Sequence, residues 1–316
     1  MQKQSLELVS DEQSLKLFLK TLPPVDQVGV DARAAMLGTR SIKNASKSEA
    51  IDLAISMVDL TTLEGADTPG KVRALCNKAV RPDPSDASVP HVGAICVYND
   101  MVSVARTHLD SIGGKSIPVA AVSTAFPSGR ASQAVKIQDT QDALDAGASE
   151  IDMVIDRGAF LSGRYGEIFD EIRLIKSLCG EKAHLKVIFE TGELVTYDNV
   201  RKASFIAMLA GADFIKTSTG KVVPAATPSV VLIMLEAVRD FYGLTGRRIG
   251  VKPAGGIRTT KDAIKQLVLV KETAGIEWLN PNLFRIGASA LLNDLIMQRM
   301  KMRDGRYSSM NYVTLD

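Results

Sequence analysis

The stretch Ile249-Gly250-Val251-Lys252-Pro253-Ala254-Gly255-Gly256-Ile257-Arg258 contains the pattern that decides the fold. A short apolar run ends in a lysine, and a proline and two glycines follow closely. A nearly continuous apolar run of this length is typical of a parallel strand covered on both sides. The glycine pair indicates a tight loop. We therefore predict a strand that ends at Lys252 and leads directly into a glycine loop.

Seven more runs of this kind occur along the chain, separated by longer amphipathic stretches. They are residues 56–60, 92–97, 118–122, 151–155, 185–189, 213–216 and 283–286. Between them Ile168, Ile172 and Ile175 repeat at helical spacing, and Thr227-Pro228 is typical of a helix start. Eight strands with helices between most of them, over about 260 residues, predict an α/β fold, a (β/α)8 TIM barrel. A doubly wound sheet is the alternative, but it usually carries a GxGxxG turn, and none is present.

The 316 residues suit one large domain with an added segment. Residues 1–50 are mixed and polar, with a break at Pro23-Pro24, and we predict an N-terminal helical extension there. Residues 51–316 would then form the catalytic barrel with a C-terminal tail. The extension could cover the bottom of the barrel or form a subunit interface.

Composition indicates a soluble cytoplasmic protein. The net charge of +2 gives no reason to expect nucleic acid or a membrane as partner. No signal-peptide core and no run long enough to span a bilayer is found. The cysteines are widely spaced, which predicts neither disulfides nor a zinc site and fits a reducing compartment. They are Cys76, Cys96 and Cys179.

Charged residues interrupt the predicted apolar strands, each in or at the end of a different strand. They are Asp59, Asp152, Lys186, Lys216, Lys252 and Arg285. A buried charge is costly unless it is paired or used. Polar residues at the strand ends of a parallel barrel converge on its C-terminal mouth, where the chemistry of this fold takes place. A structural ion-pair network is the alternative, but the number of charges in one mouth favours catalysis.

Lys216 is the predicted nucleophile. A lysine with the reference pKa of about 10.4 is almost wholly charged at pH 7 and cannot attack a carbonyl. Desolvation and a second nearby cation both lower this pKa. If the strand order is sequential, Lys252 lies on the strand next to Lys216. Together they are the candidates for a Schiff-base site.

Two glycine clusters follow the last two predicted strands, at residues 253–258 and 286–290. Loops in these positions often bind phosphate through backbone N–H groups and a helix N-terminus. Ordinary tight turns are the alternative reading. A nucleotide P-loop is excluded, because Ile215 and Val222 stand where it needs a glycine and a hydroxyl residue. The three histidines show no metal-binding spacing.

At these residues the sequence resembles the deoxyribose-phosphate aldolase family, in its longer, animal-type branch. The resemblance runs from about Val58 to Ser289 and rests on motifs that occur in order along the chain. They are Asp59-Leu60-Thr61-Thr62-Leu63, Ile95-Cys96-Val97-Tyr98, Glu150-Ile151-Asp152-Met153-Val154, Glu190-Thr191-Gly192-Glu193-Leu194, Phe214-Ile215-Lys216-Thr217-Ser218-Thr219-Gly220-Lys221, Lys252-Pro253-Ala254-Gly255-Gly256-Ile257-Arg258 and Arg285-Ile286-Gly287-Ala288-Ser289.

The resemblance implies roles for single residues. Lys216 matches the Schiff-base lysine, Lys252 the lysine that lowers its pKa, and Asp152 the carboxylate that transfers protons with a water. Asp59 and Lys186 match polar residues that line the same site. The remaining expected substrate-binding positions, mostly for phosphate, are Thr219, Gly220, Lys221, Gly255, Gly256, Gly287 and Ser289.

The implied function is reversible cleavage of 2-deoxy-D-ribose 5-phosphate to D-glyceraldehyde 3-phosphate and acetaldehyde, in deoxyribose phosphate catabolism. The family needs neither a metal nor an organic cofactor, so a phosphorylated sugar is the expected partner, in a possible homodimer. Two positions depart from the family pattern. Tyr312 is not the last residue, and Ala290 replaces the second serine of the phosphate loop. Another Schiff-base aldolase and a catalytically silent binding barrel are the alternative functions.

Overall fold

A computed structural model describes residues 9–43, 45–307, 309 and 313, and it confirms the predicted barrel. The described residues contain one parallel sheet of eight strands in the order β7-β6-β5-β4-β3-β2-β1-β8. The strands are β1 (Val58–Thr61), β2 (Ala94–Val97), β3 (Val119–Ser123), β4 (Glu150–Val154), β5 (His184–Ile188), β6 (Phe214–Lys216), β7 (Gly250–Lys252) and β8 (Ile286–Ala288).

The sheet closes on itself between β7 and the segment that leads into β8. The Val251 N–H donates to Leu283 O at 3.0 Å, the Arg285 N–H to Val251 O at 3.1 Å, and the Gly287 N–H to Pro253 O at 2.9 Å. The last strand was predicted at residues 283–286 but begins at Ile286. Before it, Phe284 forms an isolated bridge with Val251 of β7, and Gly287 of β8 forms another with Ala254, so the two segments do not make a continuous ladder.

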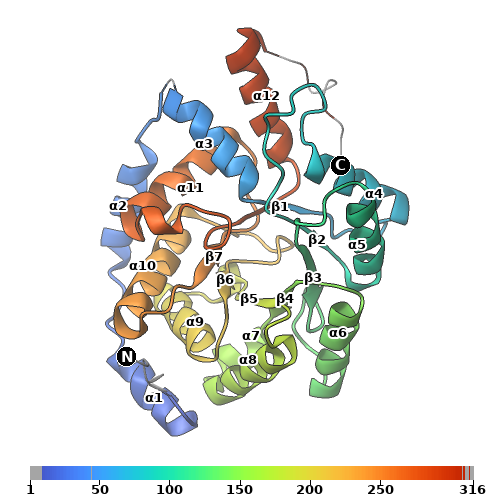
Figure 1. The fold of residues 1–316 in the computed structure, drawn as a ribbon. Helices are drawn as coiled ribbons and strands as arrows, with labels where there is room; N and C mark the ends of the chain where they lie inside the picture. Colours follow the sequence, from blue (N-terminus) through green and yellow to red (C-terminus); the bar gives the residue numbers. More distant parts are fainter. Residues whose placement is uncertain (1–8, 44, 308, 310–312, 314–316) are drawn as a thin grey trace, which may run out of the picture.

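Helices follow the strands and surround the sheet (Figure 1). They are α4 (Pro69–Val80), α5 (Val102–Ser111), α6 (Gln133–Asp145), α7 (Arg157–Leu161), α8 (Tyr165–Cys179), α9 (Tyr197–Leu209), α10 (Pro228–Thr245), α11 (Thr260–Thr273) and α12 (Leu291–Asp304). Their ends follow local chemistry. The predicted start at Thr227 is confirmed, because its hydroxyl accepts the Val230 N–H at 3.3 Å. Gly180 ends α8 with a φ of 51°.

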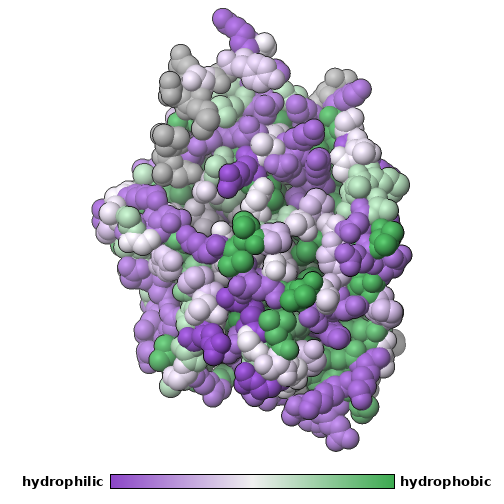
Figure 2. All heavy atoms as spheres, turned by 180° about the vertical axis from the view of Figure 1, so that it is seen from behind, coloured by the Kyte–Doolittle hydropathy of each residue, from purple (hydrophilic) through white to green (hydrophobic). Residues whose placement is uncertain are grey.

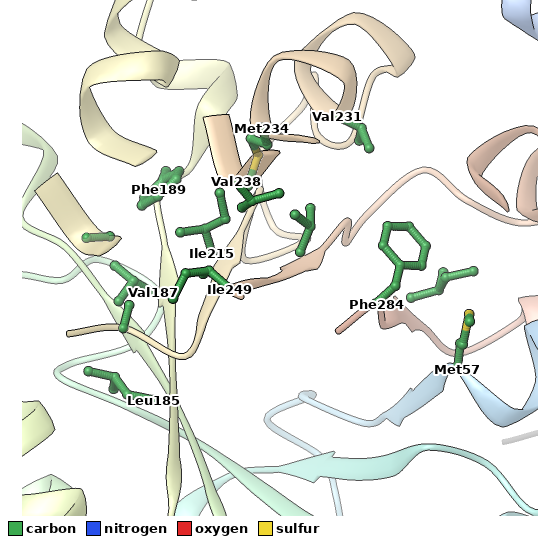
Figure 3. Packing of buried hydrophobic residues seen from close by; sticks show 14 of the residues in the cluster. Met57, Leu185, Val187, Phe189, Ile215, Val231, Met234, Val238, Ile249 and Phe284 are labelled. Carbon is green, nitrogen blue, oxygen red and sulfur yellow. The ribbon is translucent and has the colours of Figure 1, made fainter. Parts of the chain in front are cut away.

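Alternation along each strand separates the apolar shell from the polar interior. Leu185 and Val187 of β5 pack toward the helices, as does Ile215 of β6, and Figure 3 shows them in the same cluster as Met234 and Val238 of α10. Because successive side chains of a strand point to opposite faces, Lys186 and Lys216 must point into the barrel. The packing of the outer shell therefore fixes the direction of the lysines.

Three helices precede β1. They are α1 (Glu12–Thr21), α2 (Gln27–Gly38) and α3 (Ala45–Ser56). Of these, α3 lies between α11 and α12 (Figure 1). α1 packs against α8 and α9, α2 against α10 and α11, and α3 against α11 and α12. An ion pair of 2.6 Å between Arg33 and Glu236 joins α2 to α10. These helices thus follow the outside of the barrel.

The face of the molecule drawn in Figure 2 is mixed in character. In Figure 2 hydrophobic residues, in green, are dispersed among hydrophilic residues, in purple. None of the helices in the described ranges combines the length and apolar character that crossing a membrane would require.

Candidate active site

The barrel interior contains a closed ring of six alternating charges. Its carboxylates are Asp59, Glu150 and Asp152, and its cations are Lys186, Lys252 and Arg285. Every side chain of the ring is 5% exposed or less. The sheet register sets this arrangement, because Asp152 is paired with Lys186 across β4 and β5. The ring thus links residues that are far apart in the sequence.

Each ring member contacts one opposite charge on either side, and Lys186 also lies 3.9 Å from Asp59 Oδ2 across the ring. Lys252 Nζ lies 2.7 Å from Asp152 Oδ2 and 2.6 Å from Asp59 Oδ2. Arg285 bridges Asp59 at 2.6 Å and Glu150 at 3.0 Å. Lys186 closes the ring by pairing with Glu150 and, at 3.0 Å, with Asp152 Oδ1. Three carboxylates balance three cations, so the ring is neutral as a whole.

Lys216 is a seventh charged group, attached to the ring from outside. It ends β6, and its Nζ donates to Asp152 Oδ2 at 2.7 Å. It is 3% exposed. When Lys216 is protonated, the cluster carries one uncompensated positive charge in a low-dielectric interior. When Lys216 is neutral, the cluster is balanced. The charge count therefore favours the neutral amine.

The protonation of Lys216 follows from its burial and its neighbours. Burial lowers the pKa of its ammonium group most strongly; Asp152 opposes this, and the charge of Lys252 lowers the pKa further, so that the net shift is downward. Lys252 shifts the other way. Burial alone would lower the pKa of Lys252, but Asp152 and Asp59 raise it well above the ordinary value. The pKa values of the two lysines thus shift in opposite directions, because Lys252 has two carboxylates beside it and Lys216 has one.

Asp152 is held as a carboxylate. Burial alone would raise the pKa of its carboxyl group, but Lys186, Lys216 and Lys252 together lower it well below its usual range. Cys96 lies beside it, with Sγ 4.0 Å from Asp152 Oδ2. Burial raises the pKa of this thiol, so Cys96 is a small core residue here.

A cleft of about 470 Å³ opens above the ring, and Lys216 is the cluster member that reaches it. The predicted substrate-binding residues of the β6, β7 and β8 loops line this cleft. They are Thr219, Gly220, Lys221, Gly255, Gly256, Gly287 and Ser289. Lys221 pairs across the cleft with Glu64 at 2.9 Å. A larger cavity of about 760 Å³ lies between α4 and α12, but it shares only Lys71 with this cleft and none of the ring residues.

Two glycines of the cleft are required by space or backbone conformation. Gly255 has a φ of 83°, which disfavours any side chain. At Gly287 a Cβ would lie 2.9 Å from the Cβ of Ala254 and 3.2 Å from Lys252 Cε. Gly287 was predicted as a phosphate-binding position, and the structure adds that its missing side chain makes room for Lys252.

Asp59 and Lys186 were expected to line the substrate site. In the structure both are completely buried, and they belong to the ring beneath the cleft. Their neighbours are the charges of the ring, because they occur earlier in their strands than the lysines that end β6 and β7. Tyr312, which departs from the family pattern, lies outside the described residues.

Sequence reasoning missed two buried acids. Glu150 stands two residues before Asp152 on β4, and the two-residue period of a strand would have placed it on the same face. Glu190 follows β5 and contacts the loop after β6. No local signal predicted this contact. In the described part of the chain, no group of three His, Cys, Asp or Glu side chains is arranged to hold a metal ion.

Comparison with known proteins agrees with this geometry. A model of the DeoC/LacD family of aldolases matches residues 53–296. The deoxyribose-phosphate aldolase of Homo sapiens is 46% identical over 278 residues, which cover 85% of this chain and 87% of that protein. The enzyme of the same name from Mus musculus is 44% identical over 294 residues, covering 90% and 92% of the two chains.

Solved structures agree in fold. The tetrameric deoxyribose phosphate aldolase of Aeropyrum pernix superimposes with a TM-score of 0.61 at 24% identity, over 86% of this chain and 98% of that one. At this identity the likeness concerns the fold. The family match covers more than half of the sequence and includes every strand of the barrel. The chain belongs to the DeoC/LacD family of aldolases.

Proposed function

We propose that this chain is a deoxyribose-phosphate aldolase that cleaves 2-deoxy-D-ribose 5-phosphate to D-glyceraldehyde 3-phosphate and acetaldehyde, reversibly, in deoxyribose phosphate catabolism. The identity to the human and mouse enzymes supports the substrate. The position of Lys216 supports the mechanism best. It is the one uncompensated cation of the charged cluster, and its amine reaches the cleft.

Catalysis begins when the neutral amine of Lys216 attacks the aldehyde carbon, C1, of the open-chain sugar. The carbinolamine formed in this way takes up a proton on its hydroxyl group, and loss of water then gives a protonated imine, which withdraws electrons from the neighbouring carbons. The C2–C3 bond then breaks, and its electron pair moves into the imine to form an enamine. D-glyceraldehyde 3-phosphate leaves. Protonation of the enamine at C2 and hydrolysis of the imine release acetaldehyde and restore Lys216.

Asp152 supplies the proton transfer. Its Oδ2 accepts hydrogen bonds from Lys216 and Lys252 in the free protein. When the Lys216 nitrogen becomes an imine it has fewer N–H groups, and Oδ2 gains room for a water. That water takes the proton of the C3 hydroxyl group during cleavage and returns a proton to C2 afterwards. Lys252 stays charged and keeps Asp152 ionised.

The phosphate is bound at the far side of the cleft. Gly220, Gly255 and Gly256 offer backbone N–H groups without side-chain obstruction, and Lys221 offers a positive charge. α12 starts beside Ser289 and Ala290, and no side chain caps its first N–H groups. Because Ala290 has no hydroxyl group, the N–H groups at the start of α12 stay free to bind the anion. Binding of the phosphate positions the reacting carbons near Lys216.

The remaining expectations are part of the same proposal. The enzyme needs no metal or organic cofactor, because the protonated imine is the electron sink. Residues 1–50 form an extension to a catalytic unit of residues 51–316, and the enzyme works as a homodimer. A cytoplasmic location fits its three cysteines, which are free and buried.

Chemical trapping tests the proposal. The protein is incubated with acetaldehyde and reduced with borohydride, and the adduct is mapped by mass spectrometry, alongside an assay of deoxyribose 5-phosphate cleavage. We expect a single adduct at Lys216 and cleavage in the untreated sample. No adduct at Lys216 would contradict the mechanism. An adduct without cleavage would indicate an aldolase with another substrate.

A further inference from the structure

Glu190 is a buried acid that the mechanism above does not use. It lies two residues beyond the end of β5 and is 0% exposed. Its backbone is left-handed, with φ 57° and ψ 62°. This conformation costs a residue other than glycine on the order of 1 kcal/mol, so contacts around Glu190 must hold it there.

The carboxylate of Glu190 contacts the loop that follows β6. Its Oε2 accepts hydrogen bonds from the Thr219 hydroxyl and, at 3.3 Å, from the Thr219 N–H. The Thr219 hydroxyl in turn accepts the Lys221 N–H at 3.1 Å. A hydroxyl group has one proton to donate, and its oxygen already accepts a hydrogen bond from the Lys221 N–H. The Thr219 proton therefore points to Glu190, and one carboxylate orients three consecutive residues.

We propose that Glu190 is a positioning residue for the phosphate end of the substrate. It acts through Thr219, which lines the cleft together with Gly220 and Lys221, whereas Glu190 itself does not reach the cleft. By fixing Thr219, it keeps the Gly220 N–H and the Lys221 chain directed at the anion. This inference rests on the function proposed above and assigns the organisation of its phosphate site.

A role in folding alone does not explain the arrangement. The second carboxylate oxygen, Oε1, is buried and has no hydrogen-bond partner among the described residues. Burial raises the pKa of Glu190. The positive charge of Arg157 acts to lower this pKa, but Arg157 forms its ion pair with Glu193, at 2.5 Å, and not with Glu190. A buried acid with one unsatisfied oxygen and a left-handed backbone destabilises the fold. Such local cost is found where positioning matters.

The test compares two acidic residues of one loop. Glu190→Ala removes the acceptor for Thr219, and Glu193→Ala, three residues on, removes only a partly exposed ion pair. Each variant is assayed with 2-deoxy-D-ribose 5-phosphate and with unphosphorylated 2-deoxy-D-ribose. For Glu190→Ala we expect KM for the phosphorylated sugar to rise roughly tenfold or more, about 1.4 kcal/mol. We expect its kcat/KM for the unphosphorylated sugar to stay close to the native value.

Two further variants keep the test informative if Glu190→Ala does not fold. Glu190→Gln retains an oxygen that can accept from Thr219, and should recover most of the native KM. Thr219→Val replaces the hydroxyl group by a methyl group of similar size. It should raise the same KM while Glu190 itself is kept. In the double variant with Glu190→Ala, KM should be little higher than in either single variant, because both substitutions break the same chain of hydrogen bonds.

The outcomes separate this inference from the proposed function. An equal loss with both sugars, or an unchanged KM for the phosphorylated sugar, would overturn the positioning role of Glu190. Acetaldehyde has no phosphate, so Glu190→Ala should still form the borohydride-reduced adduct at Lys216. If the native protein itself lacks that adduct, the proposed function fails first.

Discussion

Lys216 and Lys252 donate hydrogen bonds to the same oxygen, Asp152 Oδ2, each at 2.7 Å. They are register partners at the ends of the adjacent strands β6 and β7. Two ammonium groups on one carboxylate oxygen repel each other, and the repulsion is relieved when one of them loses its proton. Lys252 also has Asp59 as a partner, so it is the pKa of Lys216 that is lowered.

Removal of Lys252 should impair the enzyme almost as strongly as removal of Lys216. In Lys252→Leu the second cation is gone, so the pKa of Lys216 rises and less neutral amine is present at pH 7. We therefore expect kcat/KM at pH 7 to fall roughly a hundredfold, within the range that proton-transfer groups contribute to catalysis. The acid limb of the pH profile of kcat/KM should move to higher pH, with partial recovery in alkaline buffer.

Lys216→Leu is the control for this experiment. It removes the nucleophile itself, so no pH should restore its activity. If Lys252→Leu keeps the acid limb where the native enzyme has it, then Lys252 does not set the protonation of Lys216.

Gly287→Ala should disturb Lys252 by contact. The added Cβ would lie 3.2 Å from Lys252 Cε and 2.9 Å from the Cβ of Ala254. We expect kcat to fall roughly tenfold to a hundredfold, since small displacements of catalytic groups are that costly. Gly243→Ala is the matched control, because nothing lies within 4 Å of its new Cβ inside α10. It should leave kcat unchanged and raise stability by about 0.4–1 kcal/mol. Equal kcat values in both variants would contradict the steric argument.

The ring should behave as a coupled unit in unfolding experiments. Arg285→Met leaves Asp59 and Glu150 without their shared cation, and Glu150→Gln leaves Arg285 with one carboxylate. Breaking a buried pair from one side costs about 3–5 kcal/mol. In the double variant the loss of unfolding free energy should be smaller than the sum of the losses in the two single variants, by about 0.5–3 kcal/mol. Urea unfolding of the four proteins measures it, and strictly additive losses would show that the ring is not coupled.

Much of this site was predictable because a parallel barrel gives simple sequence signals. Strands buried on both sides appear as apolar runs, so a lysine such as Lys216 at the end of a run is conspicuous. Sequential strand order then places Lys252 beside it, and the sheet confirms that order. The loops after the last two strands converge at one end of the barrel, which brought the predicted glycines into one cleft.

The rest depends on contacts that local sequence does not encode. Glu190 was missed for two reasons. Its partner, Thr219, is on another loop. Glu190 also has a left-handed backbone conformation, which glutamate rarely adopts. The depth of Asp59 and Lys186 in the barrel was not predictable either. A strand pattern gives the face on which a side chain lies, but its depth depends on the stagger of neighbouring strands. The same limit explains the misplaced start of β8.

The stability of the ring should depend on pH through Asp59. Burial alone would raise the pKa of its carboxyl group, but Lys252, Arg285 and Lys186 lower it below the usual value. A carboxyl group with a lowered pKa in the folded state stabilises the protein above its unfolded pKa of about 3.9. This contribution is lost as the pH falls from there toward the folded pKa. The native protein should therefore lose stability below about pH 4.

Asp59→Asn isolates this effect because it cannot titrate at that position. The difference in unfolding free energy between the native protein and Asp59→Asn should be constant from about pH 7 to pH 5 and should shrink as the pH falls below 4. Urea unfolding at each pH measures both proteins under the same conditions. A difference that stays constant down to pH 3 would mean that Lys252 and Arg285 do not lower the pKa of Asp59. The ring would then owe its position to packing, and its charges would contribute to catalysis alone.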